Sequence, residues 1–176
     1  GGITLEREDF NQDIKMQAEL AIAESNIIIF VVDGRSELNQ NDYLVRDMLI
    51  KSGKKVIVAV NKLDNLKLQE ESVYNYYVLG FEYVIPISAV HNKGINALLD
   101  EVIKDVEESV DIEDESIKFT VIGRPNVGKS SLINALVGSK RSIVSDIAGT
   151  TRDATDSKFK YNGQDFTVID TAGLRK

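Results

Sequence analysis

The sequence predicts a three-layer α/β fold with a mostly parallel sheet. Four runs, each apolar at nearly every position, indicate parallel strands that are buried on both faces. These runs cover residues 26–33, 54–64, 82–90 and 117–123. Helical stretches lie between them, and alternation of strands with helices favours a sheet that is covered by helices on both faces.

One helix and one hairpin are well defined by their patterns. The helix is expected over residues 96–110, and the hairpin over residues 157–170, around Asn162-Gly163. The apolar residues that recur on one face of the helix are Leu98, Leu99, Val102, Ile103, Val106 and Val110. Because Asn-Gly supplies the two positive-φ residues of a type I′ turn, an antiparallel hairpin is expected at the edge of the sheet.

Composition restricts the class of protein. The 176 residues are 43% hydrophobic and 28% charged, as in a globular protein with a sizeable core. No apolar run reaches the roughly 20 residues that span a bilayer. The sequence has no cysteine, which excludes disulfides and is typical of a cytoplasmic protein. The net charge of −7 disfavours binding of nucleic acid by the surface as a whole, and the single histidine, His91, is interpreted as a loop residue.

A phosphate-binding loop is predicted where GRPNVGKS fits the pattern G-x-x-x-x-G-K-[ST] between a strand and a helix. Glycines let backbone N–H groups converge on phosphate oxygens, and the helix N-terminus adds partial positive charge. Lys129 is expected to reach the β- and γ-phosphates, and Ser130 to bind Mg²⁺. The residues predicted for this loop are Gly123, Arg124, Pro125, Asn126, Val127, Gly128, Lys129, Ser130 and Ser131.

Two further loops are predicted to sense the γ-phosphate. Asp170 ends an apolar strand in the run DTAGL, where a carboxylate is suited to hold Mg²⁺ through water, and Gly173 is expected to offer a backbone N–H. GTTRD has the position of a switch loop, in which a threonine hydroxyl binds Mg²⁺. The predicted residues are Thr150, Thr151, Asp170, Thr171, Ala172, Gly173 and Leu174. Catalytic roles are assigned to Lys129, Gly173 and a threonine of the switch loop.

A guanine-reading loop is predicted where NKLD ends the second strand. Guanine offers two adjacent donors, its ring N1–H and its exocyclic amine, to the acceptor-only carboxylate of Asp64, and adenine has no such pair. An ATPase is therefore disfavoured. Lys62 is expected to lay its stem along the base, and a backbone N–H near Ala89 to meet the guanine carbonyl. The predicted residues are Asn61, Lys62, Asp64, Ser88 and Ala89.

Together these motifs resemble the EngA/Der family of tandem ribosome-assembly GTPases, among the TrmE-Era-EngA-like P-loop GTPases, over essentially the whole chain. GRPNVGKSSLINAL, GTTRD and DTAGLRK are similar to the opening of that family's second G domain. GGI, VVDGR, NKLD and ISA are similar to the closing part of its first G domain. The resemblance implies a GTPase that uses GTP or GDP with Mg²⁺ and acts in assembly of the large ribosomal subunit.

The resemblance also implies roles for single residues. Thr151, rather than Thr150, is the implied catalytic threonine and Mg²⁺ ligand beside Ser130 and Asp170. Asn126 corresponds to an asparagine that helps to hold K⁺ in K⁺-activated relatives. Leu174 stands where other GTPases have a water-positioning glutamine, which implies slow hydrolysis that K⁺ accelerates.

The order of the motifs is circularly permuted, because NKLD and ISA precede the P-loop, the switch threonine and DTAG. Two explanations stay open: parts of two G domains of a tandem GTPase, favoured by sequence detail, or a circularly permuted ribosome-assembly GTPase.

Residues 1–110 are expected to supply strands 4 to 6 of a six-stranded G-domain sheet, and residues 117–176 are expected to supply strands 1 to 3. An acidic linker at 111–116 is expected to join them. Each half alone would expose an apolar central strand as an unpaired edge of a sheet. The halves are therefore expected to pair with each other, within one chain or as a swapped dimer.

Three classes of function are compatible with these residues. The first is a GTPase, the second is a nucleotide-binding module without turnover, and the third is a folded fragment that binds no nucleotide. Turnover distinguishes the first from the second, and nucleotide affinity distinguishes the second from the third.

Overall fold

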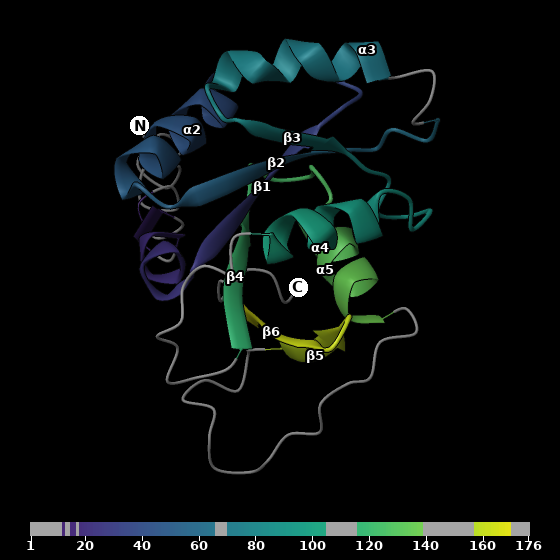
Figure 1. Ribbon diagram of the computed structural model, residues 1–176. Coiled ribbons are helices and arrows are strands. Elements are labelled where there is room, and N and C mark those ends of the chain that lie inside the picture. The colour runs from purple at the N-terminus through teal and green to yellow at the C-terminus, as the bar shows by residue number, and fades with distance from the viewer. Residues whose placement is uncertain are drawn as a thin grey trace.

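The computed structural model describes residues 12, 15–16, 18–65, 70–104, 116–138 and 157–169. Its strands form one six-stranded sheet in the order β3-β2-β1-β4-β6-β5 (Figure 1). The strands are β1 (Ile27–Asp33), β2 (Lys55–Asn61), β3 (Tyr83–Pro86), β4 (Ser116–Ile122), β5 (Ser157–Tyr161) and β6 (Gln164–Ile169). The helices are α2 (Gln40–Ser52), α3 (Glu70–Val73), the 3₁₀ helix η1 (Tyr74–Leu79), α4 (Ile95–Ile103) and α5 (Lys129–Gly138). A further helical segment covers residues 18–24.

The predicted fold class is confirmed. Every strand pair is parallel except β5 with β6, which form the predicted edge hairpin. Asn162 and Gly163 have φ angles of 49° and 76°, as a type I′ turn requires. The strand order is the one expected when β1 to β3 take the places of strands 4 to 6 of a G-domain sheet, and β4 to β6 those of strands 1 to 3.

The two parts of the chain meet in the middle of the sheet, where β1 pairs with β4. Ile27 lies opposite Phe119, and Phe30 lies opposite Ile122. The main chain of Asn26 donates to the Lys118 carbonyl at 2.7 Å. At the hairpin, the Tyr161 hydroxyl donates to Asp100 of α4 at 2.8 Å. One chain therefore supplies both sides of the sheet. The proposed linker lies mostly outside the described residues, and β4 begins at Ser116, which the prediction placed in the linker.

Apolar residues fill both faces of the sheet, which makes the fold three-layered. On one face, α4 and α5 pack against β-strand residues that include Phe119, Phe159 and Phe166. These three rings contact one another, with Phe159 and Phe166 stacked at 5.1 Å between centroids. On the other face, α2, η1 and the helical segment over 18–24 cover Phe30 and its neighbours. Figure 1 shows α4 and α5 together on one side of the sheet.

Two predicted strands were too long, and each ends early for a local reason. β2 ends at Asn61 because Lys62 has a φ of 68°, which leaves the extended conformation. β3 ends at Pro86, and Ser88 then forms an isolated bridge with Lys93 that closes a tight turn. α4 is described from Ile95 to Ile103, and the predicted continuation to residue 110 falls outside the described residues. Both early ends place polar side chains in loops at the same edge of the sheet.

Candidate nucleotide-binding site

The predicted phosphate-binding loop joins β4 to α5 at the carboxyl end of the sheet. Its glycines are required by close packing. A Cβ on Gly123 would lie 2.5 Å from the Val31 carbonyl oxygen, and one on Gly128 would overlap Asn61 Nδ2. Asn126 and Gly128 have φ angles of 66° and 97°. The loop thus has a conformation that L side chains rarely adopt, with the buried Val127 anchoring it from below.

Lys129, the first residue of α5, folds back over this loop. Its Nζ donates to the main-chain carbonyls of Gly123 at 2.6 Å and Arg124 at 2.9 Å. Burial lowers the pKa of the Lys129 ammonium from its ordinary value. The side chain is therefore already held across the loop, at the position where a phosphate-binding lysine is needed.

Asn61 fixes the guanine-reading loop against the phosphate-binding loop. Its Nδ2 donates to the Val127 carbonyl at 2.9 Å, and its Oδ1 accepts from the Ala89 N–H at 3.0 Å. The residue is 2% exposed, so these bonds form away from water, where an unpaired group is costly. Both parts of the guanine-reading loop, NKLD and ISA, thus meet the phosphate-binding loop at one buried side chain.

Lys62 lies between the same two loops. Its Nζ donates to Asp33 Oδ2 at 2.8 Å and to the Asn126 carbonyl at 2.7 Å. Burial raises the pKa of Asp33, but hydrogen bonds from Lys62 and from the Arg35 N–H outweigh it, so the pKa lies below its ordinary value. Asp33 therefore holds the lysine that the sequence analysis expected beside the base.

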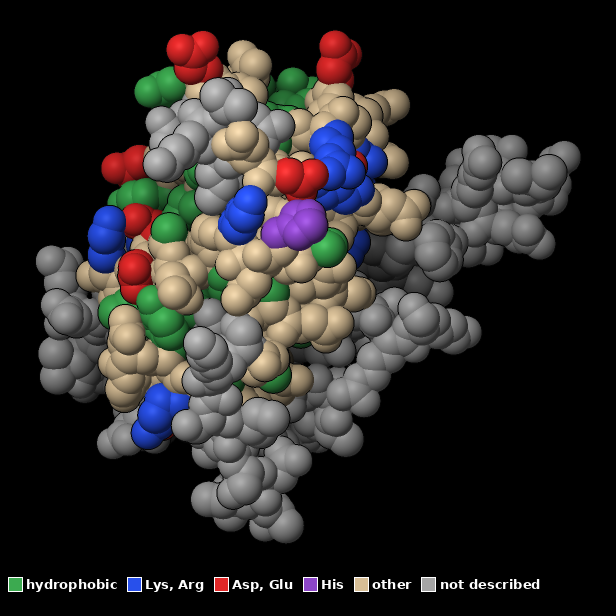
Figure 2. Space-filling view, turned by 90° about the vertical axis from the view of Figure 1, so that its right-hand side faces the viewer, with side chains coloured by type: hydrophobic (Ala, Val, Ile, Leu, Met, Phe, Trp, Pro, Cys, Tyr) green, Lys and Arg blue, Asp and Glu red, His purple; other side chains and the backbone are tan. Residues whose placement is uncertain are grey.

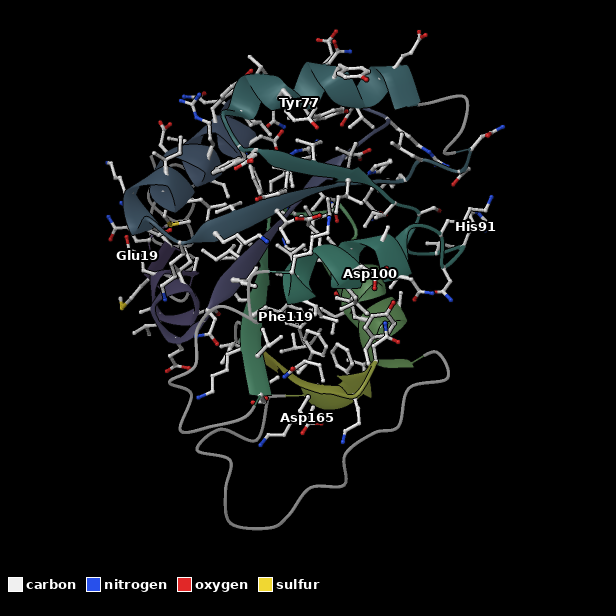
Figure 3. The ribbon with its side chains drawn as sticks, in the orientation of Figure 1. Glu19, Tyr77, His91, Asp100, Phe119 and Asp165 are labelled. Atoms are coloured by element: carbon white, nitrogen blue, oxygen red, sulfur yellow. The ribbon has the colours of Figure 1, made fainter. Side chains whose placement is uncertain are left out.

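Asp64 lies at the open side of this edge and is surrounded by donors. Arg35 Nη2 donates to its Oδ2, and Ser88 Oγ donates to its Oδ1 at 3.3 Å. His91 Nε2 lies 3.6 Å from Oδ1, and Lys93 Nζ donates to the Asp64 carbonyl at 2.7 Å. Figure 2 shows the imidazole of His91 at the surface with acidic and basic side chains beside it, and Figure 3 places it on the turn before α4. His91 is thus a loop residue, as interpreted from the sequence.

Desolvation by neighbouring atoms raises the pKa of the Asp64 carboxyl, but the hydrogen bond and charge of Arg35 outweigh this, so the pKa lies below the ordinary value. The carboxylate is consequently ionised and acceptor-only at neutral pH. That is the state needed to receive two N–H donors from one molecule.

The Arg124 side chain contacts α2 and the segment before it. Its Nε lies 3.2 Å from both carboxylate oxygens of Asp42, and its Nη2 donates to Ser36 Oγ at 2.9 Å. Asp42 is 1% exposed and also accepts from the Asn39 N–H in the capping box of α2. The guanidinium therefore ties the loop to α2, and the role predicted for Arg124 remains one for its backbone.

Several predicted residues are placed less completely. Pro125 and Ser130 are exposed, and Ser131 is half-buried on α5. Thr150, Thr151 and residues 170–174 lie outside the described residues; β6 ends at Ile169, whose carbonyl accepts from Thr120 Oγ1 at 2.9 Å. Within the described part of the chain, no group of three or more His, Cys, Asp or Glu side chains could hold a metal ion. None of the described helices is long and apolar enough to cross a membrane.

Arg35, Asp33 and His91 lie at this edge but were not predicted as site residues from the sequence. Asp33 is the last residue of β1 and Arg35 follows it, and the parallel register places Asp33 opposite Asn61. Because the carboxyl ends of neighbouring parallel strands lie at one edge of the sheet, the position of Asp33 and Arg35 at the end of the strand before NKLD is the sequence feature that could have identified both residues.

Comparison with known proteins agrees with this geometry. A family model described as "Elongation factor Tu GTP binding domain" matches residues 8–108, and one described as "50S ribosome-binding GTPase" matches residues 118–176. The chain therefore belongs to the family of GTP-binding domains typified by elongation factor Tu, and its class is the P-loop GTPases.

Among individual relatives, the chain is similar to proteins named GTPase Der, which confirms the resemblance seen in the motifs. It is 51% identical to GTPase Der of Staphylococcus epidermidis and 48% identical to that of Staphylococcus haemolyticus, in each case over the whole chain and 41% of the relative. The chain thus spans about two-fifths of the length of these relatives. YjeQ from Thermotoga maritima shares the fold, with a TM-score of 0.51 and 20% identity over 87% of this chain and 50% of that one.

Proposed function

We propose that this chain binds GTP and GDP together with Mg²⁺ and cleaves the β–γ phosphoanhydride of GTP by attack of water. The observation that carries the proposal is the Asn61 side chain, which joins the loop that reads guanine to the loop that holds phosphates through bonds of 2.9 Å and 3.0 Å. One mononucleotide is thereby able to reach Asp64 with its base and Lys129 with its phosphates.

Different groups in the site are suited to phosphate binding, to Mg²⁺ binding and to sensing of the γ-phosphate. Backbone N–H groups of 123–131 and the Lys129 ammonium would stabilise charge on the phosphates as it develops. Mg²⁺ is a hard cation that prefers oxygen ligands, and the Ser130 hydroxyl is proposed as one of them. Thr151 and Asp170 are proposed to complete the Mg²⁺ site. When bound, Mg²⁺ would neutralise charge on the β- and γ-oxygens. Gly173 is proposed to sense the γ-phosphate through its N–H.

Base selectivity gives the sharpest test of this proposal. In the Asp64→Asn variant, affinity for GDP should fall about a hundredfold, because two hydrogen bonds to a charged acceptor are lost. The same variant should gain affinity for xanthosine diphosphate, since the asparagine amide donates to the C2 carbonyl of xanthine and its oxygen accepts the ring N1–H. Competition titrations against fluorescent GDP measure both changes.

The matched control for that experiment is Asp47→Asn, which removes an exposed carboxylate of α2 that pairs with Arg46. It should leave both affinities unchanged. Unaltered GDP binding by Asp64→Asn, or equal binding of ADP and GDP by the unmodified chain, would refute guanine reading at this site. Release of phosphate from GTP separates a GTPase from a nucleotide-binding module without turnover.

We further propose that K⁺ assists hydrolysis at Asn126. This residue has a φ of 66°, its carbonyl accepts from Lys62, and its exposed side chain belongs to the phosphate-binding loop. GTP hydrolysis should be about tenfold faster in KCl than in NaCl at equal ionic strength, because a positive charge beside the transferring phosphoryl group lowers the barrier. Asn126→Ala should lose this preference. Equal rates in the two salts would remove K⁺ from the proposal.

The wider role is inferred from relatives. The family model matched by residues 118–176 is described as a 50S ribosome-binding GTPase, which supports binding to the large ribosomal subunit, and we propose that the chain acts in assembly of that subunit in the cytoplasm. Pairing of β1 with β4 inside one chain favours a monomer over a dimer that exchanges halves, and light scattering of the purified chain measures this directly.

A further inference from the structure

The turn after β1 is packed tightly against the guanine-reading loop. The Gly34 N–H donates to the Asn61 carbonyl at 2.7 Å, and a Cβ on Gly34 would lie 2.7 Å from the same oxygen. The Arg35 N–H donates to Asp33 Oδ1 at 2.8 Å. The backbone that carries the Arg35 side chain is therefore fixed relative to Asn61 before any ligand binds.

From this turn, the Arg35 guanidinium contacts the guanine-reading loop at two points. Its Nε donates to the Lys62 carbonyl at 3.2 Å, and its Nη2 donates to Asp64 Oδ2. One end of the planar guanidinium thus holds the main chain of the loop while the other end holds its carboxylate. A lysine at this position supplies the positive charge, but its ammonium lacks the fixed, planar geometry that lets a guanidinium donate to the Lys62 carbonyl and to the Asp64 carboxylate together.

The Asp64 carboxylate has few hydrogen-bond acceptor positions left after its contacts within the protein. A carboxylate has about four lone-pair positions on its two oxygens. Arg35 uses one on Oδ2, and Ser88 uses one on Oδ1 at 3.3 Å. Counting the hydrogen bonds from described residues, with His91 Nε2 beyond hydrogen-bond distance at 3.6 Å from Oδ1, one position remains on each oxygen, and the two match the adjacent donors on the edge of guanine.

We propose that Arg35 is a positioning residue that sets guanine specificity, by orienting Asp64 so that both free acceptor positions face the base. This inference rests on the proposed function, because it concerns the same binding site. It differs from a blocking role, in which Arg35 would compete with the base for Asp64 and its removal would strengthen binding.

The test compares GDP with inosine diphosphate, which lacks the exocyclic amine. If Arg35 orients the carboxylate, Arg35→Gln should lower the GDP-to-IDP affinity ratio about tenfold, the size of one lost hydrogen bond to a charged group. A freely rotating carboxylate still reaches the N1–H of both bases, so IDP affinity should fall less than GDP affinity. Arg35→Lys should restore only part of the ratio, since it keeps the charge and loses the two-point geometry.

Arg46→Gln is the matched control, because Arg46 pairs with Asp47 on α2 rather than with the site. Its GDP-to-IDP ratio should equal that of the unmodified chain. An unchanged ratio in Arg35→Gln, or tighter binding of GDP, would overturn the inference while leaving GTP binding intact. Failure of the unmodified chain to prefer GDP over ADP would instead overturn the proposed function.

Discussion

Replacing Lys129 by alanine should lower the affinity for GDP and GTP by about a hundredfold to a thousandfold, the value of several charge-assisted hydrogen bonds to phosphate oxygens. The ammonium is held over the loop by the Gly123 and Arg124 carbonyls at 2.6 Å and 2.9 Å. A nucleotide therefore meets a cation that has already been partly desolvated and oriented. Titration of fluorescent GDP measures the loss.

The fold should tolerate this change. Burial disfavours the charged form of Lys129, and that cost offsets the two hydrogen bonds lost from the empty loop, so unfolding free energy should shift by no more than about 1 kcal/mol. Lys51→Ala removes an exposed lysine at the far end of α2 and should change neither quantity. Retention of full GDP affinity by Lys129→Ala would show that the loop does not hold phosphates.

Asn61→Ala should lower both stability and nucleotide affinity. It leaves the Val127 carbonyl and the Ala89 N–H without the partners that they have at 2.9 Å and 3.0 Å. Two unpaired groups in a buried place cost about 3 kcal/mol in total. Denaturant unfolding monitors the stability. Because Lys62 then remains as the described side-chain link between the two loops, they are held less firmly, and GDP affinity should fall more than tenfold, since 1.4 kcal/mol is a factor of ten.

The exposed Asn41 of α2 offers the matched asparagine-to-alanine change, which should leave stability within about 0.5 kcal/mol. If Asn61→Ala unfolded at the same denaturant concentration as the unmodified chain, the buried junction would contribute nothing measurable. A drop in stability with unchanged GDP affinity would separate the structural role of Asn61 from its proposed role in the site.

The sheet was predictable because its signal is local. The continuous apolar runs mark β1, β2 and β4, which are buried along nearly their whole length, and Asn162-Gly163 fixes the hairpin turn. The strand order followed from the motifs, since each marks one strand end of a G domain. Strand ends were less predictable, because the positive φ of Lys62 that ends β2 is not marked in the sequence by a glycine.

The site was predictable where a motif carries it and not where a single side chain arrives from another strand. Asn61, Asp64 and Lys129 are recognised within their own loops. Arg35 is adjacent to Asp64 only through the register of β1 with β2. Arg124 was expected in the phosphate-binding loop, yet its side chain pairs with the buried Asp42, a contact that no local pattern specifies.

Pairing of β1 with β4 also affects the rate and the order in which the strands of this chain assemble. The two strands are brought together across a sequence separation of 92 residues, so their pairing closes a long loop and belongs among slow, non-local events. During synthesis, β1, β2 and β3 emerge well before β4. Until then, the apolar edge of β1 lacks its partner, a condition that favours aggregation. The centre of the sheet therefore stays open while β1 to β3 wait for β4, and it is the part that most needs protection during that interval.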